Sequence, residues 1–166
     1  MQTFVTFLHV FAAAVLGAVI GLERQWRASI AGIRTNSLVA TGSAMFVLLG
    51  SVALGGPTRD PTRVAAQIVS GIGFLGAGVI LRDGLKIRGL NTAATLWCAA
   101  AVGALAGTGQ FGLALAGAGV VVATNLVLRP VGQIVGRASE RPRRPLIRKR
   151  RRQRVLPPAQ TPPSRS

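Results

Sequence analysis

The chain has 166 residues, of which 49% are hydrophobic and only 14% are charged. A typical soluble domain has about 25% charged residues, whereas this chain is depleted in charge and has a mean hydropathy of +0.46. The composition argues against an ordinary soluble domain and is typical of a polytopic membrane protein. A single cysteine, Cys98, excludes an internal disulfide and any multi-cysteine metal site.

Five apolar runs, each close to the roughly 20 residues that a bilayer core requires, predict five membrane-spanning helices. Charged or turn-forming connections separate them, such as the break at Gly55-Gly56-Pro57. We therefore predict an all-α membrane protein, a bundle of five helices forming a transmembrane domain over residues 1–130. The expected spans are 4–22, 37–54, 64–81, 91–107 and 111–128.

The net charge of +16 belongs mostly to the end of the chain, because twelve of the twenty Lys and Arg residues lie from Arg129 onward. Residues 131–166 are rich in Arg and Pro, and we expect them to form a disordered basic tail. The tail contains no aromatic residue to stack on bases, so we expect no nucleic-acid partner. Two roles stay open for it: attraction to anionic lipids, or a topology signal.

The distribution of Lys and Arg also predicts the orientation. The first connection and the insert after the third run each carry three basic residues, whereas the connection between the second and third runs carries Arg59 and Arg63. We therefore expect the N-terminus outside and the C-terminus in the cytoplasm.

Glycines inside the apolar runs predict close contacts between helices. The sequence from Gly71 to Gly76 also matches the dinucleotide-binding pattern G-x-G-x-x-G. That fingerprint needs a preceding strand and an acidic residue about 20 positions later, and no acid lies between Asp83 and Glu140. We therefore interpret these glycines as helix-packing positions. The predicted packing residues are Gly17, Gly21, Gly71, Gly73, Gly76 and Gly103.

The insert from Leu81 to Asn91 carries charges and a strong turn signal, Asp83-Gly84, which predicts a short hairpin at the cytoplasmic face. A hairpin there would bring its basic residues close to the first connection, and we hypothesise that Glu23 and Asp83 pair with some of the arginines at this face. Asn91 is expected to cap the fourth helix. The arginines and lysine concerned are Arg24, Arg34, Arg82, Lys86 and Arg88.

The arrangement of reactive residues argues against an enzyme and against an ion carrier. All four acidic residues lie outside the apolar runs, whereas ion pathways commonly contain a carboxylate within the membrane. His9 and Gln67 are expected to donate hydrogen bonds between helices, and Cys98 is expected to be inert packing. We expect no enzymatic activity, no cofactor and no bound metal.

Four segments together resemble the MgtC/SapB family of bacterial inner-membrane proteins. They are GLERQ at 21–25, GIRT at 32–35, residues 63–78, and RGLNTAATLW at 88–97. The resemblance implies a five-span inner-membrane protein linked to growth at low magnesium and, in pathogens, to survival inside host cells. It also implies that such a protein modulates other membrane proteins. The functional polar residues that it implies are Glu23, Arg24, Gln25, Arg34, Gln67, Arg88, Asn91 and Cys98.

Long members of that family carry a soluble regulatory domain after the last span, and here we expect a short form with only the basic tail. The expected partners are the lipid bilayer and other membrane proteins. Alternatives left open are a component of a magnesium or cation transport system, an anionic-lipid-binding protein, and a homo-oligomer.

Overall fold

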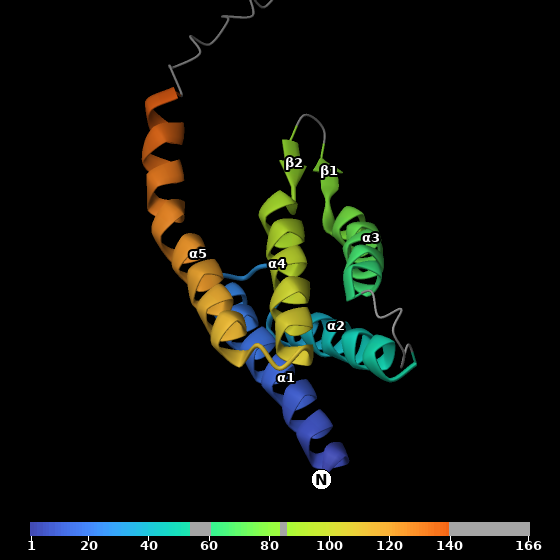
Figure 1. Cartoon of the computed structure of the whole chain (residues 1–166). Helices are drawn as coiled ribbons and strands as arrows, with labels where there is room; N and C mark the ends of the chain where they lie inside the picture. The colour runs from blue at the N-terminus through green and yellow to red at the C-terminus, as the bar shows by residue number, and fades with distance from the viewer. Residues whose placement is uncertain (54–60, 84–85, 140–166) are drawn as a thin grey trace, which may run out of the picture.

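The computed structural model describes residues 1–53, 61–83 and 86–139 (Figure 1). It confirms an all-α fold with one small hairpin. The helices are α1 (Gln2–Trp26), α2 (Ile33–Ala53), α3 (Pro61–Val79), α4 (Leu90–Gly107) and α5 (Phe111–Ser139), and the strands are β1 (Leu81–Asp83) and β2 (Lys86–Arg88).

Three helices in the described ranges are long and apolar enough to cross a membrane: α1, α4, and α5 over Phe111–Leu128. In α3 the apolar stretch is shorter, at Arg63–Val79. In α2 polar residues interrupt the apolar run, and one of them joins two helices because the hydroxyl of Ser37 donates to the Ala14 carbonyl at 2.9 Å. The chain is therefore a multi-pass membrane protein, and the crossing of α2 and α3 remains a prediction.

Helix α4 is the centre of the bundle and contacts each of the other four helices. Its buried face is built mainly from small side chains, which pack against alanines of α1, α2 and α5. A second cluster joins α4 to α3 through Leu96 and Ile72. Small side chains let helix axes approach closely, which is how helices associate in lipid, where apolar surface gives little driving force.

Three of the predicted packing glycines lie at close helix contacts. A Cβ on Gly17 would stand 2.6 Å from the carbonyl oxygen of Asn36, and one on Gly21 would stand 2.5 Å from the Cα of Ile33. In α4, a Cβ on Gly103 would stand 2.1 Å from the carbonyl oxygen of Ala40. Real Cβ atoms do not approach so closely, so α1, α2 and α4 fit together only because these residues are glycine.

The glycines of α3 behave differently. Helix α3 is continuous through the G-x-G-x-x-G pattern, without the strand and turn of a nucleotide-binding loop. A Cβ on Gly76 would make an ordinary contact with Ala93 at 3.6 Å, but one on Gly71 or Gly73 would meet nothing within 4 Å. For these two residues the packing prediction is wrong within a single chain, because no described atom lies close enough to contact a side chain at either position.

The predicted hairpin is confirmed. Strands β1 and β2 pair antiparallel, with Leu81 opposite Arg88 and Asp83 opposite Lys86, while the turn itself falls on residues outside the described ranges. The residue at the N-cap of α4 is Gly89, not Asn91, because α4 begins at Leu90. The predicted capping role of Asn91 is therefore wrong.

Helix α5 continues past the expected end of the fifth span and includes residues 131–139, which we expected in the tail. Apolar residues at helical spacing, Val131, Ile134 and Val135, give a physical reason for the extension. The rest of the expected tail, residues 140–166, lies outside the described residues.

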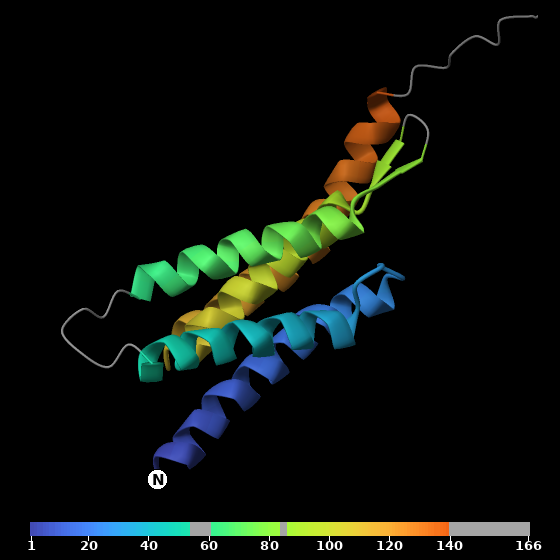
Figure 2. The same cartoon turned by 90° about the vertical axis from the view of Figure 1, so that its right-hand side faces the viewer.

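The connection between α1 and α2, the hairpin and the far end of α5 lie at one end of the bundle (Figure 2). The N-terminus and the start of α3 lie toward the opposite end (Figure 2). The first of these ends therefore carries most of the basic residues of the described chain, such as Arg34 and Arg88.

Candidate functional site

Arg24, at the end of α1, contacts two hydroxyl groups, one from Ser29 in the connection after α1 and one from Thr92 at the start of α4. Its guanidinium donates to Ser29 Oγ at 2.7 Å and to Thr92 Oγ1 at 3.3 Å. The two hydroxyls also lie 3.1 Å apart and share a hydrogen bond. Arg24 is only 8% exposed, so this polar junction of Arg24, Ser29 and Thr92 gives a buried cation two hydroxyl acceptors and joins α1 to α4.

The backbone after α1 turns sharply to present Ser29 to this junction. Ala28 has a φ of 52°, a left-handed conformation that is uncommon outside glycine. The Gln25 side chain then crosses to the next helix, where its Oε1 accepts from the backbone N–H of Ile33 at 3.3 Å. The N–H of Ile33 belongs to the first turn of α2, so Gln25 satisfies a helix-terminal donor and fixes the turn between α1 and α2.

Glu23 lies beside the junction and is also buried, with 7% of its side chain exposed. Its Oε1 lies 2.6 Å from Nε of Arg27, one turn later in the same helix. We hypothesised a pairing with Arg24, Arg34 or a basic residue of the hairpin, and the ion pair that Glu23 forms is instead with Arg27. Arg27 lies four residues after Glu23 on the same helix, so the two side chains meet on one face of α1. Asp83, the other acid of that hypothesis, has a side chain outside the described residues.

Two further buried polar residues, Asn36 and Thr95, and the half-buried Asn125 were not predicted. Asn36 is fully buried, and its amide donates to the carbonyl oxygens of Ala31 at 3.3 Å and Gly32 at 2.9 Å. Thr95 donates to its own helix and accepts a 3.5 Å bond from Asn125 of α5. Asn125 could have been found from the sequence, because it is an amide side chain within an apolar run. Asn36 was missed because it falls just before the expected span 37–54, in the connection.

The remaining predicted residues divide by location. Arg34, Arg88 and Asn91 are exposed at the same end of the bundle as the polar junction. Cys98 is half-buried on α4 with a free thiol. Gln67 is exposed on α3, and it forms no hydrogen bond with the described residues, so its predicted role as a donor between helices is wrong within this chain.

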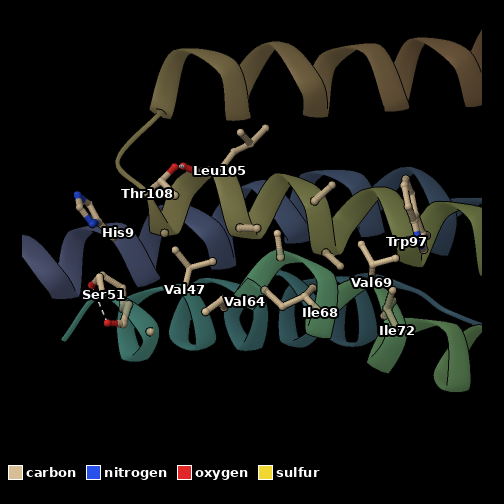
Figure 3. Close-up of a pocket in the computed structure, with 17 residues that line it drawn as sticks. His9, Val47, Ser51, Val64, Ile68, Val69, Ile72, Trp97, Leu105 and Thr108 are labelled. Atoms are coloured by element: carbon tan, nitrogen blue, oxygen red, sulfur yellow. Dashed lines mark hydrogen bonds between the residues drawn. The ribbon is translucent and has the colours of Figure 1, made fainter. Parts of the chain in front are cut away.

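His9 also departs from expectation. Its imidazole forms no hydrogen bond within the described chain and packs edge-on against Phe111 of α5, with ring centroids 5.1 Å apart. It borders an apolar cavity of about 780 Å³ between α2, α3 and α4. His9, Ser51 and Thr108 lie at one end of this cavity and Trp97 toward the other (Figure 3). The walls are mostly aliphatic, so this cavity is suited to apolar contents.

The described residues contain no group of three or more His, Cys, Asp or Glu side chains that could hold a metal ion. The polar residues that the structure brings together instead connect helices. Charged and hydroxyl groups lie buried at the end of α1 and the start of α4, and basic and amide side chains are exposed around them. This arrangement can fix the relative positions of helices and present a polar surface for binding.

Comparison with known proteins gives consistent matches over most of the chain. The model of the MgtC family matches residues 10–134. The protein MgtC of Salmonella typhimurium strain LT2 is 55% identical over 133 residues, which cover 80% of this chain and 56% of the relative. The protein MgtC of Brucella abortus strain 2308 is 55% identical over 123 residues, covering 74% of this chain and 51% of the relative.

An uncharacterized protein of Synechocystis is 52% identical over 130 residues, which cover 78% of this chain and 55% of the relative. The chain thus spans about half the length of the curated relatives that it matches. No solved structure matches the chain.

Proposed function

Because this chain belongs to the MgtC family, we propose that it is a non-enzymatic regulatory protein of the bacterial inner membrane. It acts by binding other membrane proteins and supports adaptation to low magnesium. In a pathogen the same activity would support survival inside host cells.

The observation that carries this proposal is a stripe of small residues on the outward face of α3. Ala66, Ser70, Gly73 and Ala77 recur at intervals of four, three and four, and all are exposed. The opposite face of α3 holds Ile72, which packs toward α4. Small residues at this spacing let a second helix approach the backbone closely in lipid. The small-residue stripe therefore suits a transmembrane helix of a partner.

Exposed polar residues at the end with the polar junction supply a second contact region. Arg34, Arg88 and Asn91 lie on three different elements there. Basic and amide side chains suit acidic or hydrogen-bonding segments of a partner outside the bilayer. In this proposal the buried Glu23 and Arg24 hold the helices in position, and the exposed residues contact the partner.

The proposed orientation has the N-terminus outside and the basic end of the bundle in the cytoplasm. Support comes from the first connection and the hairpin, whose basic residues share one end (Figure 2). Alkaline phosphatase fused after Ser139 should be inactive, and phosphatase fused at Gly109 should be active. The reverse pattern would reject this orientation.

Site-specific photocrosslinking in cells at limiting magnesium tests partner binding. A photoreactive residue at Ser70 should give one crosslinked membrane protein, identifiable by mass spectrometry. The same residue at Val120, which is 66% exposed on α5, should not. Gly73→Leu should abolish both the crosslink and growth at limiting magnesium. If growth survives when the crosslink is lost, the proposal fails.

A transport measurement separates this function from the alternative of a magnesium carrier. Proteoliposomes containing the purified chain alone should show no Mg²⁺ uptake above that of empty liposomes. Uptake that depends on the chain would favour a transport component over a regulator.

A further inference from the structure

A second apolar hollow lies between α2 and α3 and adjoins the cavity of Figure 3, with which it shares wall residues such as Val64 and Ile68. This α2–α3 groove has a volume of about 770 Å³, within the range of roughly 300 to 1,000 Å³ that is usual for small-ligand sites. One wall comes from α2, with Gly42 and Phe46, and the other from α3. The two helices run side by side (Figure 2), so the groove follows their length.

The α3 wall changes chemically along its length in a regular way. Arg63, Gln67, Gly71 and Leu75 all line the groove and are spaced four residues apart, so they form one row along the helix. Each step advances about 6 Å along the axis. The row therefore begins with a guanidinium at the end of the bundle, continues with an amide and a gap without a side chain, and ends with an apolar side chain.

The groove also has free space between its two walls, where an acyl chain would lie. A Cβ on Gly42 of α2 or on Gly71 of α3 would meet nothing within 4 Å. Phe46 of α2 and Leu75 of α3, on the two walls, are 60% and 50% exposed. Neither Arg63 nor Gln67 forms a hydrogen bond or an ion pair with another described residue. The groove thus offers two polar groups at its mouth and apolar walls below them.

We propose that the α2–α3 groove binds one anionic phospholipid from the leaflet at the Arg63 end of the bundle. The guanidinium of Arg63 pairs with the lipid phosphate, and the Gln67 amide donates to an ester carbonyl. One acyl chain then lies against Phe46, passes Gly71 and contacts Leu75.

The polarity and the length of the row both support this occupant. A phospholipid carries its charge, its ester groups and its hydrocarbon in the same order as the row from Arg63 to Leu75. The row spans about 18 Å along the helix, and half of a bilayer core is about 15 Å thick. A guanidinium binds phosphate well because its fork of donors matches the oxygens. The row therefore reaches from the headgroup level to near the bilayer centre.

This site is separate from the small-residue stripe assigned above to a partner helix. Gly71 lines the groove and Gly73 does not, although both are exposed and a Cβ on either would meet nothing within 4 Å. The two glycines therefore form a matched pair for testing. A leucine at Gly71 fills the groove, whereas a leucine at Gly73 leaves it open.

Native mass spectrometry of the purified full chain, offered equal amounts of phosphatidylglycerol and phosphatidylcholine with identical acyl chains, tests the proposal. Wild type should retain one phosphatidylglycerol, at least about fivefold more than phosphatidylcholine. Gly71→Leu should lower retention of this lipid at least fivefold, and Gly73→Leu should leave it unchanged. Arg63→Gln should reduce the preference for phosphatidylglycerol about fivefold, as expected for one basic residue near the membrane surface.

Arg34→Gln removes one exposed positive charge at the other end of the bundle and should leave the preference unchanged. If Gly71→Leu does not elute as a folded protein, Arg63→Gln and Gln67→Leu, which alter exposed side chains, provide the test. Equal retention of the two lipids by wild type would overturn the proposal. So would equal retention by the Gly71→Leu and Gly73→Leu variants.

The remaining candidate occupant is a second copy of the chain. Because Cys98 is the only cysteine, Leu75→Cys in a Cys98→Ser background reports on this directly. Oxidation in native membranes should give no disulfide-linked dimer. A dimer formed in high yield through position 75 would show that protein fills the groove, and it would overturn the lipid site.

Discussion

Arg24 of α1 donates a 3.3 Å hydrogen bond to Thr92 of α4, although the two residues are 68 positions apart in the sequence. Both side chains are buried, at 8% and 5% exposed. Ser29 completes the polar junction by contacting both. A charged donor with hydroxyl acceptors in a water-poor site gives a stronger contact than the same groups in water. The junction therefore holds α1 and α4 together where the chain leaves the bundle.

Replacing Thr92 by valine should destabilise the bundle by about 1 to 2 kcal/mol, because the buried guanidinium loses one acceptor and valine keeps the shape of threonine. The measurement is the midpoint of unfolding in mixed micelles of increasing denaturing detergent. Thr41→Val is the matched control, since the Thr41 hydroxyl donates at 2.7 Å within its own helix. Equal losses from the two substitutions would contradict a special role for the junction.

The helices and the hairpin could be predicted because their signals are local. A run of apolar residues indicates a helix wherever it packs, and Asp83-Gly84 indicates a turn without reference to the rest of the chain. The polar junction could not be predicted in the same way. It depends on the left-handed backbone at Ala28, which presents Ser29, and on which face of α4 turns toward α1.

The glycines show the same limit. Gly103 and Gly73 both lie in apolar helical runs, and the sequence offers no local difference between them. One lies against the backbone of Ala40, and the other faces open space. Which face of a helix is covered depends on the packing of the whole bundle. Small residues in a helix therefore predict that a close helix contact exists, but they do not predict which of these residues makes it.

Gly103→Ala should therefore destabilise the bundle, by about 1 to 3 kcal/mol, because the added methyl forces α2 and α4 apart. The control is Gly112→Ala on α5, where a Cβ meets nothing within 4 Å. That change should be neutral or stabilising by up to about 1 kcal/mol, since alanine favours helix over glycine. Thermal unfolding of both variants in detergent gives the comparison, and a Gly103→Ala variant as stable as wild type would contradict the packing described here.

Gly89 joins the hairpin to α4 with a φ of 88°, and a Cβ there would stand 1.9 Å from the carbonyl oxygen of Val79. Gly89→Ala should cost roughly 3 kcal/mol or more, because the left-handed backbone and the clash act together. Gly109 separates the cost of the left-handed backbone from that of the clash. Its φ is 80°, but a Cβ there would approach only the end of the His9 side chain, at 3.4 Å. Gly109→Ala should cost about 1 to 2 kcal/mol. Equal losses in unfolding midpoint would show that the clash at Gly89 is relieved.

The ion pair between Glu23 and Arg27 should respond asymmetrically to substitution. Glu23 has 7% of its side chain exposed and Arg27 has 27%, so Arg27 can reach water if its partner is lost and Glu23 cannot. Arg27→Ala should cost roughly 3 kcal/mol, because it leaves a buried carboxylate without its counter-charge. Glu23→Gln, which removes the charge and keeps the shape, should cost about 1 kcal/mol or less.

The double variant Glu23→Gln with Arg27→Ala should therefore be more stable than Arg27→Ala alone, since the buried charge that makes the single change costly is then absent. Arg34→Ala, at an exposed position at the same end of the bundle, should change stability by no more than about 0.5 kcal/mol. Unfolding midpoints of wild type, the two single variants and the double variant in one detergent provide the cycle, and Arg34→Ala is the control. If Arg27→Ala proves no more harmful than Glu23→Gln, the carboxylate is reached by water or by another donor, and the ion pair is not what keeps Glu23 buried.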